Sequence, residues 1–229
     1  MTDRLTVLSS MATRQVLAEL AGSSEEQSRA PVTIRPVAGV EAARLVRAGD
    51  PVDVIILASK VMEALEAEGH VVAGTRVGFA RSGMAVAVRA GTAGPPIEDE
   101  DSVRRAILDA RGIGYSTGPS GDHLMRLIER WGVAASVLPR LRQAPPGVPV
   151  GAMLARGEAD LGFQQLSELL HVPGIEILGP LPSEIQAVTV FVAGIAQASG
   201  RRDDARALIA SLASGDAEAA KRRHGLEPA

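Results

Sequence analysis

The sequence predicts an α/β fold built on a mostly parallel sheet. Short β-branched or apolar runs alternate with segments whose apolar residues recur at helical spacing. One of these runs, "VDVIILA" (52–58), is almost continuously apolar, which is typical of a strand buried on both faces of a sheet. The chain has 229 residues, of which 46% are hydrophobic, so it can bury a core in one large domain or two small ones.

The first half of the chain begins with a strand and a helix. "RLTVLS" (4–9) predicts a strand, and residues 12–28 predict a helix with Val16, Leu17 and Leu20 on one face. The next expected elements are a strand at 32–37, a helix carrying Ala42, Leu45 and Val46, the strand at 52–58, a helix at 60–69, and strands at 75–80 and 84–90. A linker, "GTAGPPIED", follows.

The second half repeats this alternation. The expected elements are a helix at 99–110, a strand at 112–117, helices at 120–131 and 148–157, strands at 159–164, 174–182 and 186–195, and a helix at 201–223 that ends at Gly225.

Composition excludes several classes of function. The formal net charge is −3 and aromatic residues make up 2%, so neither a basic surface nor a stacking platform for nucleic acid is expected. The chain has no cysteine, which excludes disulfides and thiolate chemistry, and its four histidines lack metal-ligand spacing. We therefore expect no metal, no cofactor and no nucleic-acid partner, and we expect a monomer.

The N-terminal stretch "MTDRLTVLSSMATRQVLAELAG" gives an expectation for the cellular compartment of the protein. It has no basic segment followed by a long apolar run, and no apolar run in the chain approaches 18 residues. We expect no membrane insertion and a cytoplasmic protein, or a periplasmic one if a leader has been removed.

The segment "GYSTGPSGDHLMRLIERWGV" (114–133) places a loop rich in glycine and hydroxyl groups directly before a helix. One interpretation is a turn with a helix cap. The other is an anion site, because glycine lets a backbone approach an anion closely. Its candidate ligand contacts are Ser116, Thr117, Gly118, Ser120 and Gly121.

Other polar residues also have two interpretations. Ser10 and Thr13 can cap the first helix or both cap it and contact a ligand. Arg14 can pair with a surface acid such as Glu19 or bind an anion. Arg81, in "ARSGM", can mark a hinge or a ligand contact.

Five stretches carry a resemblance to a known family: "RLTVLSSMATRQVLAELA", "ARLVRAGDPVDVIILAS", "IGYSTGPSGDHLMRLIERWGV", "VPVGAMLARGEADLGFQQLSE" and "KRRHGLEP". Together they resemble the type II periplasmic binding-protein fold, and most closely its molybdate-binding family. The resemblance implies two lobes, 1–80 with 196–229 and 86–186, built on two mixed sheets flanked by helices. Two crossing strands near 81–90 and 186–195 would join them, with the ligand held in the cleft between the lobes.

The same resemblance implies which loops hold the ligand. They are Ser9–Thr13, Val37–Val40 with Gly39, Tyr115–Gly121, and Pro146–Gly151 with Val148 and Pro149. Gln164 and Gln165 lie beside them; since side chains alternate along a strand, at most one faces the ligand, and the matched position favours Gln165. Each of the four loops precedes a helix, so unpaired backbone N–H groups would point at an anion.

Three positions depart from the molybdate-binding pattern. Two serine positions fall on Ala12 and Gly39, and a tyrosine position falls near Gln165. A site that loses three hydroxyl donors to a dianion binds it more weakly, which favours an organic carboxylate over molybdate.

Three hypotheses of function follow. The first is a solute-binding protein for a small anion, either a carboxylate or an oxyanion. The second is an isomerase, since the fold also resembles the aconitate isomerase family, with Glu168, Asp122 and His123 as candidate bases. The third is the ligand-sensing half of a regulator, although no helix-turn-helix module precedes the first strand.

Overall fold

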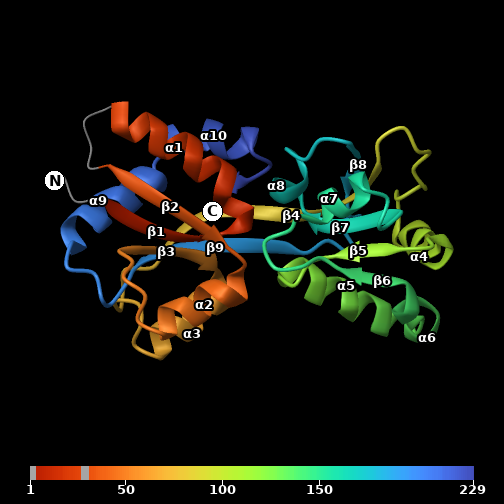
Figure 1. Ribbon diagram of the computed structural model, residues 1–229, viewed down its shortest axis with the longest axis horizontal. Helices are drawn as coiled ribbons and strands as arrows, with labels where there is room; N and C mark the ends of the chain where they lie inside the picture. The colour runs from red at the N-terminus through yellow and green to blue at the C-terminus, as the bar shows by residue number, and fades with distance from the viewer. Residues whose placement is uncertain (1–3, 27–30) are drawn as a thin grey trace. The chain divides into compact units, whose positions relative to one another are not determined.

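The computed structural model describes residues 4–26 and 31–229. The chain divides into two compact units, unit 1 (Met1–Arg81 with Val190–Ala229) and unit 2 (Ser82–Thr189). Two strands run through the boundaries, β4 (Val77–Arg89) and β9 (Val188–Ile195) (Figure 1). The lobe boundaries and hinges implied by the resemblance stay a prediction.

Unit 1 is built on three parallel strands, β1 (Leu5–Ser10), β2 (Val32–Val37) and β3 (Val54–Ala58). β1 lies between the other two, with Leu5 opposite Val32 and Val7 opposite Val54. β9 pairs with β3 in the antiparallel sense, and the short β10 (Glu227–Pro228) pairs with β4.

Helices cover both faces of the unit 1 sheet (Figure 1). Val7, Val54 and Ile56 pack with α1 (Arg14–Glu26), α9 (Arg202–Leu212) and α10 (Glu218–Arg223). Leu8, Ile55 and Leu57 pack on the other face with α2 (Gly39–Arg47) and α3 (Ser59–Ala67). Because consecutive side chains of a strand point to opposite faces, β3 is apolar at every position, which confirms the prediction of a doubly buried strand.

Unit 2 has a mixed sheet. β5 (Ile113–Tyr115) lies between β6 (Leu141–Gln143) and β7 (Leu161–Gln165), and the three are parallel. β4 pairs in the antiparallel sense with β7 and with β8 (Ile175–Pro180).

The faces of this sheet are also buried by helices. Met84, Val86 and Phe163 pack with α4 (Glu100–Asp109) and α5 (Pro119–Arg130). Ala85 and Ala87 pack with Leu154 of α7 (Val150–Ala155) and Leu169 of α8 (Leu166–Leu169). The remaining short elements are η1 (Met11–Thr13), α6 (Ala134–Val137), η2 (Leu138–Arg140) and η3 (Gly215–Ala217).

The α/β alternation is confirmed, and several details differ. The strands follow a single hydrogen-bonded order, β2-β1-β3-β9-β4-β7-β5-β6, where two sheets were expected. The two strands expected at 75–80 and 84–90 are one continuous strand, β4. Its pairing with β10 reaches Arg81 and its pairing with β7 begins at Met84, so the polar residues "RSG" between the two expected strands are part of β4.

Three of the expected helices differ in extent. The helix expected at 201–223 is interrupted, since the Ser214 hydroxyl donates to the Ser211 carbonyl oxygen and Gly215 follows. The helix expected at 148–157 is the shorter α7. The helix expected at 12–28 begins as η1, and its last two positions lie outside the described residues.

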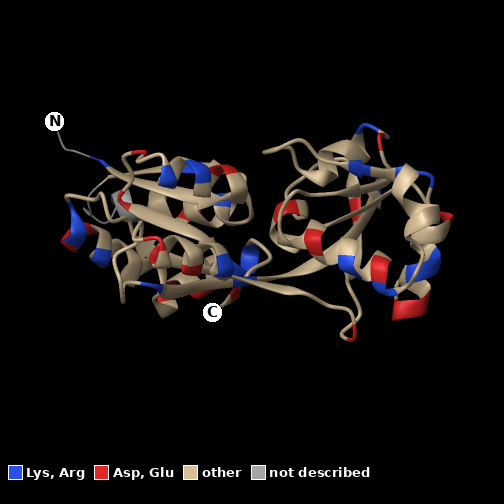
Figure 2. Cartoon of the chain, turned by 90° about the horizontal axis from the view of Figure 1, so that it is seen from below, with Lys and Arg blue, Asp and Glu red and all other residues tan. Residues whose placement is uncertain are grey.

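Charged residues of both signs are interspersed on each unit (Figure 2). Within residues 4–26 and 31–229, no helix is both long enough and apolar enough to span a bilayer.

Candidate ligand-binding site

In unit 1, three helical segments begin where parallel strands end. η1 follows β1 directly, α2 starts two residues after β2, and α3 follows β3 directly. Because parallel strands place their carboxyl ends at one edge of a sheet, these segments start side by side; we call this the unit 1 edge. In α/β proteins, ligands bind at such edges.

Three predicted residues lie at the end of β1. Ser10 accepts a hydrogen bond from the Ala12 N–H at 3.3 Å, and the Thr13 hydroxyl donates to the Ser10 carbonyl oxygen at 3.0 Å. Ser9 is fully buried, and its Oγ has no hydrogen-bond partner among the described residues. Leaving a buried hydroxyl unpaired costs about 1–3 kcal/mol, so Ser9 is the residue here with unused bonding capacity.

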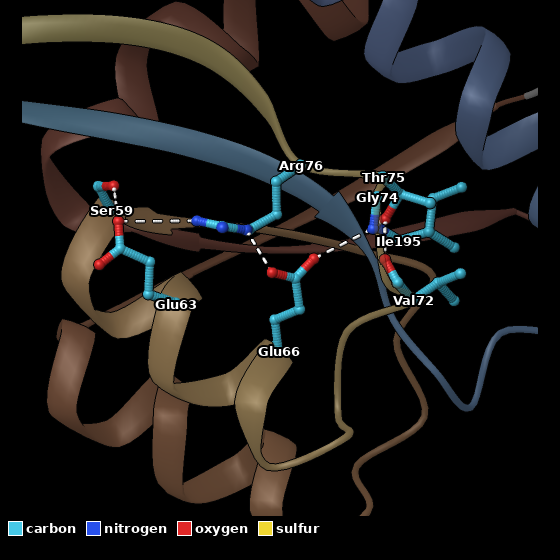
Figure 3. A network of polar contacts seen from close by, with 8 residues as sticks. All are labelled: Ser59, Glu63, Glu66, Val72, Gly74, Thr75, Arg76 and Ile195. Carbon is cyan, nitrogen blue, oxygen red and sulfur yellow. Dashed lines mark hydrogen bonds and ion pairs between the residues drawn. The ribbon is translucent and has the colours of Figure 1, made fainter.

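Ser59 also lies at the unit 1 edge, at the start of α3, and sequence analysis did not select it. Its hydroxyl donates to Glu63 at 2.9 Å, and Glu63 lies 3.7 Å from Arg76, whose Nε donates to Glu66 at 2.7 Å (Figure 3). The strand run followed at once by serine in "VIILAS" was the available signal. This hydroxyl already has a protein partner.

The same network holds α3 to the start of β4. Glu66 accepts a hydrogen bond from the Gly74 N–H at 3.2 Å. The Thr75 hydroxyl donates to the Val72 carbonyl oxygen at 2.7 Å and accepts from the Ile195 N–H of β9 at 3.2 Å (Figure 3). The polar side chains of α3 in this network are therefore used to hold α3 against β4 and β9.

The other predicted ligand contacts of unit 1 are Gly39, Arg14 and Arg81, and each lies in a different environment. Gly39 is the first residue of α2, with open space where a Cβ would be. Arg14 is exposed at the start of α1. Arg81 is exposed on β4 and its Nε donates to the Pro228 carbonyl oxygen at 3.0 Å, so this donor serves the β10 contact.

In unit 2 the carboxyl ends of β5, β6 and β7 form a second such edge, the unit 2 edge. The loop after β5 contains most of the predicted hydroxyls. Ser116 Oγ lies 2.9 Å from Ser120 Oγ and accepts a hydrogen bond from the Gly118 N–H at 3.2 Å. Gly118 is the N-cap residue of α5 and provides no side-chain cap, so the first N–H groups of this twelve-residue helix have no capping side chain. Thr117 is half-buried.

Gly121 is required by the packing of this loop. A Cβ at this position would lie 1.9 Å from the Ser116 carbonyl oxygen, far inside contact distance. The glycine therefore lets the chain fold back on itself, which explains why the sequence places it just inside the helix.

The two adjacent glutamines at the end of β7 have different roles. Gln164 Oε1 accepts a hydrogen bond from the Val150 N–H at 2.7 Å and so caps α7. Gln165 Nε2 donates to Thr189 Oγ1 at 2.6 Å, and its Oε1 has no partner among the described residues. Both side chains are 2% exposed, because consecutive side chains of a strand point to opposite faces and helices cover both faces of this sheet.

Val148 and Pro149, also predicted, precede α7. The Val148 N–H donates to the Pro145 carbonyl oxygen at 3.0 Å, and Pro149 has no N–H. Neither offers a free backbone donor.

Besides Ser102 of the α4 capping box, sequence analysis missed three buried polar residues of unit 2: Ser82, Ser167 and Thr189. They lie on β4, α8 and β9, so only the tertiary structure brings them near Gln165. Ser82 Oγ accepts from the Ser167 N–H at 3.5 Å, and Ser167 Oγ has no partner in the described part of the chain.

The buried polar groups of both edges are neutral hydroxyls and amides. Among the described residues, Lys221 of α10 is the one charged residue that is buried, and its ammonium lies 4.9 Å from the centre of the Phe79 ring. Burial lowers the pKa of Lys221 from its ordinary value, while nearby Glu218 acts in the opposite direction. The buried groups that these edges offer an anion are therefore neutral donors.

The candidate bases differ in environment. His123 Nε2–H donates to the Ile185 carbonyl oxygen at 2.8 Å, and Asp122 is exposed on α5. Glu168 is half-buried on α8, directly after Ser167. Its carboxylate is thus the candidate base nearest in the chain to the unpaired atoms of Gln165 and Ser167.

Sequence comparisons place the chain in a family. The model of the bacterial extracellular solute-binding protein family matches residues 5–227. Aconitate isomerase from Pseudomonas sp is 39% identical over 186 residues, which cover 81% of this chain and 70% of the relative.

Similar solved structures show the same fold. The Azotobacter vinelandii periplasmic molybdate-binding protein has a TM-score of 0.82 and 22% identity, covering 97% of this chain and 98% of that one. Peb3 from Campylobacter jejuni has a TM-score of 0.73 and 12% identity, covering 97% and 99%. These likenesses show the fold alone. The chain therefore belongs to the bacterial extracellular solute-binding protein family and has the type II periplasmic binding-protein fold.

Proposed function

We propose that this protein isomerises a small unsaturated tricarboxylic acid of the aconitate type. The observation that carries the proposal is the 39% identity to aconitate isomerase across 81% of this chain. The neutral hydroxyl and amide groups at the unit 2 edge support it, because a tricarboxylate needs separate hydrogen bonds for separate groups.

The unit 1 edge also argues against molybdate as the ligand. Ala12 and Gly39 stand where the molybdate-binding pattern has serines, and neither offers a hydroxyl. Gln165, near the tyrosine position, has its amide nitrogen engaged by Thr189. Tetrahedral oxyanions accept hydrogen bonds only, so each missing donor weakens their binding.

The chemistry is a proton transfer between two carbons. A base removes a proton from the methylene carbon, the double bond shifts, and the proton returns to the former vinylic carbon. We assign the base to the Glu168 carboxylate, since His123 Nε2 is engaged by a backbone carbonyl and Asp122 is exposed. The negative charge that develops on the substrate is stabilised by N–H and hydroxyl donors, the largest contribution in many enzymes.

The experiment that tests the proposal follows cis- and trans-aconitate by proton NMR with purified protein. Conversion of one isomer into the other, at a rate proportional to protein concentration, is expected. A spectrum unchanged over hours with protein in excess of substrate contradicts the proposal.

A second candidate function is ligand binding without turnover. The match to the solute-binding protein family over residues 5–227 favours it. A thermal-shift panel separates the two: a bound ligand at about one hundred times its Kd stabilises by about 2.7 kcal/mol. Stabilisation by aconitate, citrate or a dicarboxylate without any isomer conversion favours this second function.

A further inference from the structure

Unit 2 has a cavity at the end of its sheet opposite to the unit 2 edge. Its volume is about 590 Å³, within the range of about 300–1,000 Å³ that is typical of small-molecule sites. It is lined by the end of β4, the start of β7, the end of α4, the turn between α7 and β7, and the linker that follows β4. Gln165 lies at the other end of β7, so this cavity is separate from the candidate ligand-binding site.

Apolar side chains form much of the lining, and the linker wall is held by close packing. Val88, Ala106 and Leu161 contribute aliphatic side chains from β4, α4 and β7. The linker lies tightly against β8, since a Cβ at Gly94 would lie 2.3 Å from Leu178 Cδ2. A ligand with an apolar portion therefore meets a surface that is already formed.

Four charged residues also line the cavity: Arg89, Asp109, Arg111 and Asp160. Two of them neutralise each other, because Arg111 Nη2 donates to Asp160 Oδ1 at 3.1 Å and Arg111 Nε donates to Asp160 Oδ2 at 3.3 Å. Within residues 4–26 and 31–229, the Arg89 guanidinium and the Asp109 carboxylate have no hydrogen bond or ion pair. One cation and one anion thus remain for a ligand.

These two unpaired charges come from different elements. The Arg89 guanidinium lies against the turn between α7 and β7, with its Nη1 3.7 Å from the position that a Cβ at Gly157 would occupy. Gly157 has a φ of +74°, which favours glycine, so no side chain of the turn covers the guanidinium there. Asp109 is the last residue of α4. The cavity therefore offers a ligand a donor on one element and an acceptor on another.

The chemistry of the two groups narrows the class of ligand. A guanidinium only donates hydrogen bonds and a carboxylate only accepts them, so a ligand that satisfies both has an anionic and a cationic group. The carboxylate and ammonium groups of a free α-amino acid are such a pair, and an apolar side chain matches the apolar lining. A dicarboxylate or tricarboxylate would be attracted by Arg89 and repelled by Asp109.

We infer that this cavity is a second ligand site, which binds a free α-amino acid with an apolar side chain. The ligand carboxylate accepts hydrogen bonds from Arg89, its ammonium group donates to Asp109, and its side chain contacts Val88 and Leu161. The inference goes beyond the proposed function and does not depend on it, because none of these residues belongs to either edge.

The test is a methyl NMR titration of the whole protein with L-leucine at pH 7. The methyl resonances of Val88, Ala106 and Leu161 are expected to shift and to reach saturation. Two leucine analogues each lack one charged group: 4-methylpentanoate has no ammonium group and 3-methylbutylamine has no carboxylate. Each should bind about three- to tenfold more weakly than leucine, because a hydrogen bond to a charged group at a partly exposed site contributes modestly.

Two variants assign the charged partners. R89Q should weaken leucine binding by the same factor and leave 3-methylbutylamine binding unchanged, whereas D109N should weaken leucine binding and leave 4-methylpentanoate binding unchanged. R126Q and E129Q, at exposed positions of α5, are the matched controls and should keep the affinity for leucine.

Three outcomes overturn the inference. They are the absence of a saturable shift at these methyl groups, equal affinity for leucine and 4-methylpentanoate, and equal losses of affinity in R89Q and R126Q. None of these measurements uses aconitate, so the proposed function stands or fails separately.

Discussion

The two edges are built alike and differ in what they offer a ligand. Each consists of helical segments that begin at the carboxyl ends of parallel strands. At the unit 1 edge, Ser10, Thr13 and Ser59 are engaged by the protein, whereas the buried Ser9 hydroxyl has no partner in the described part of the chain. Within the same described residues, the unit 2 edge has unpaired atoms on Gln165 and Ser167, with Glu168 next in sequence.

Under the proposed function, we expect the groups that distinguish ligands and move a proton to lie in unit 2, and Ser9 of unit 1 to affect binding only. Variants in unit 2 are therefore expected to change turnover, and variants at the unit 1 edge to change affinity.

The variant Glu168→Gln gives the largest effect expected. It keeps the size of the side chain and removes the base, so kcat for aconitate isomerisation should fall about 10²–10⁴-fold. KM should change little. The matched control is Asp122→Asn, an exposed acid of the same unit; an equal loss of kcat in both variants breaks the assignment to Glu168.

Gly121→Ala is expected to disrupt the unit 2 loop itself. The new Cβ collides with the Ser116 carbonyl oxygen, so the loop must open, at a cost of about 1–3 kcal/mol in unfolding free energy. Chemical denaturation measures this change, and ligand titration should show affinity reduced at least tenfold.

Gly118→Ala is the matched control for that change. Its Cβ would lie 3.8 Å from the nearest atom, Ser116 Oγ, an ordinary contact. Similar destabilisation in both variants would show that the tight turn at Gly121 is not the cause.

Two adjacent serines at the unit 1 edge, Ser9 and Ser10, should have opposite effects on stability and on ligand affinity. Ser9→Ala removes a buried hydroxyl that has no partner among the described residues, so stability should hold or rise, by up to about 1–3 kcal/mol, while ligand affinity falls about tenfold. Ser10→Ala removes a cap and should cost about 1 kcal/mol of stability. Thermal unfolding and calorimetry on both variants check the pair; reversed effects would mean that Ser9 has a structural role.

The smallest effect concerns Lys221, a buried cation of unit 1 outside its edge. Its folded pKa is lowered by burial, so the unfolded chain binds more protons, and stability rises with pH from the folded pKa up to about the ordinary value of 10.5. Lys221→Met should remove this alkaline rise and raise stability at neutral pH by about 1 kcal/mol.

Lys60→Met, at the exposed lysine of the same unit, is the matched control. It should leave the pH profile of stability unchanged when unfolding is followed from pH 7 to 11. A flat wild-type profile over this range contradicts the assigned role of Lys221.

Much of the fold could be predicted because its signals are local. The doubly buried β3 is apolar at every position, and the glycine and hydroxyl cluster before α5 marks the start of that helix. The short α6 and α8 escaped prediction because four residues carry too little periodicity to distinguish helix from turn. β4 was divided wrongly, since its pairing with β10 and β7 depends on distant parts of the chain.

By itself the sequence determined the α/β alternation and the loop at 116–121, because local spacing and glycine placement encode them. Gln165 was selected through the family resemblance, and its role as a ligand contact stays a prediction. Only the tertiary structure decided which polar atoms are already used. Gln164 and Gln165 are chemically identical neighbours, yet one caps α7 and the other bonds to Thr189 and has an amide oxygen without a partner among the described residues. That distinction depends on partners from α7 and β9, which local sequence does not specify, since hydrogen bonds between distant segments are fixed only when the chain packs.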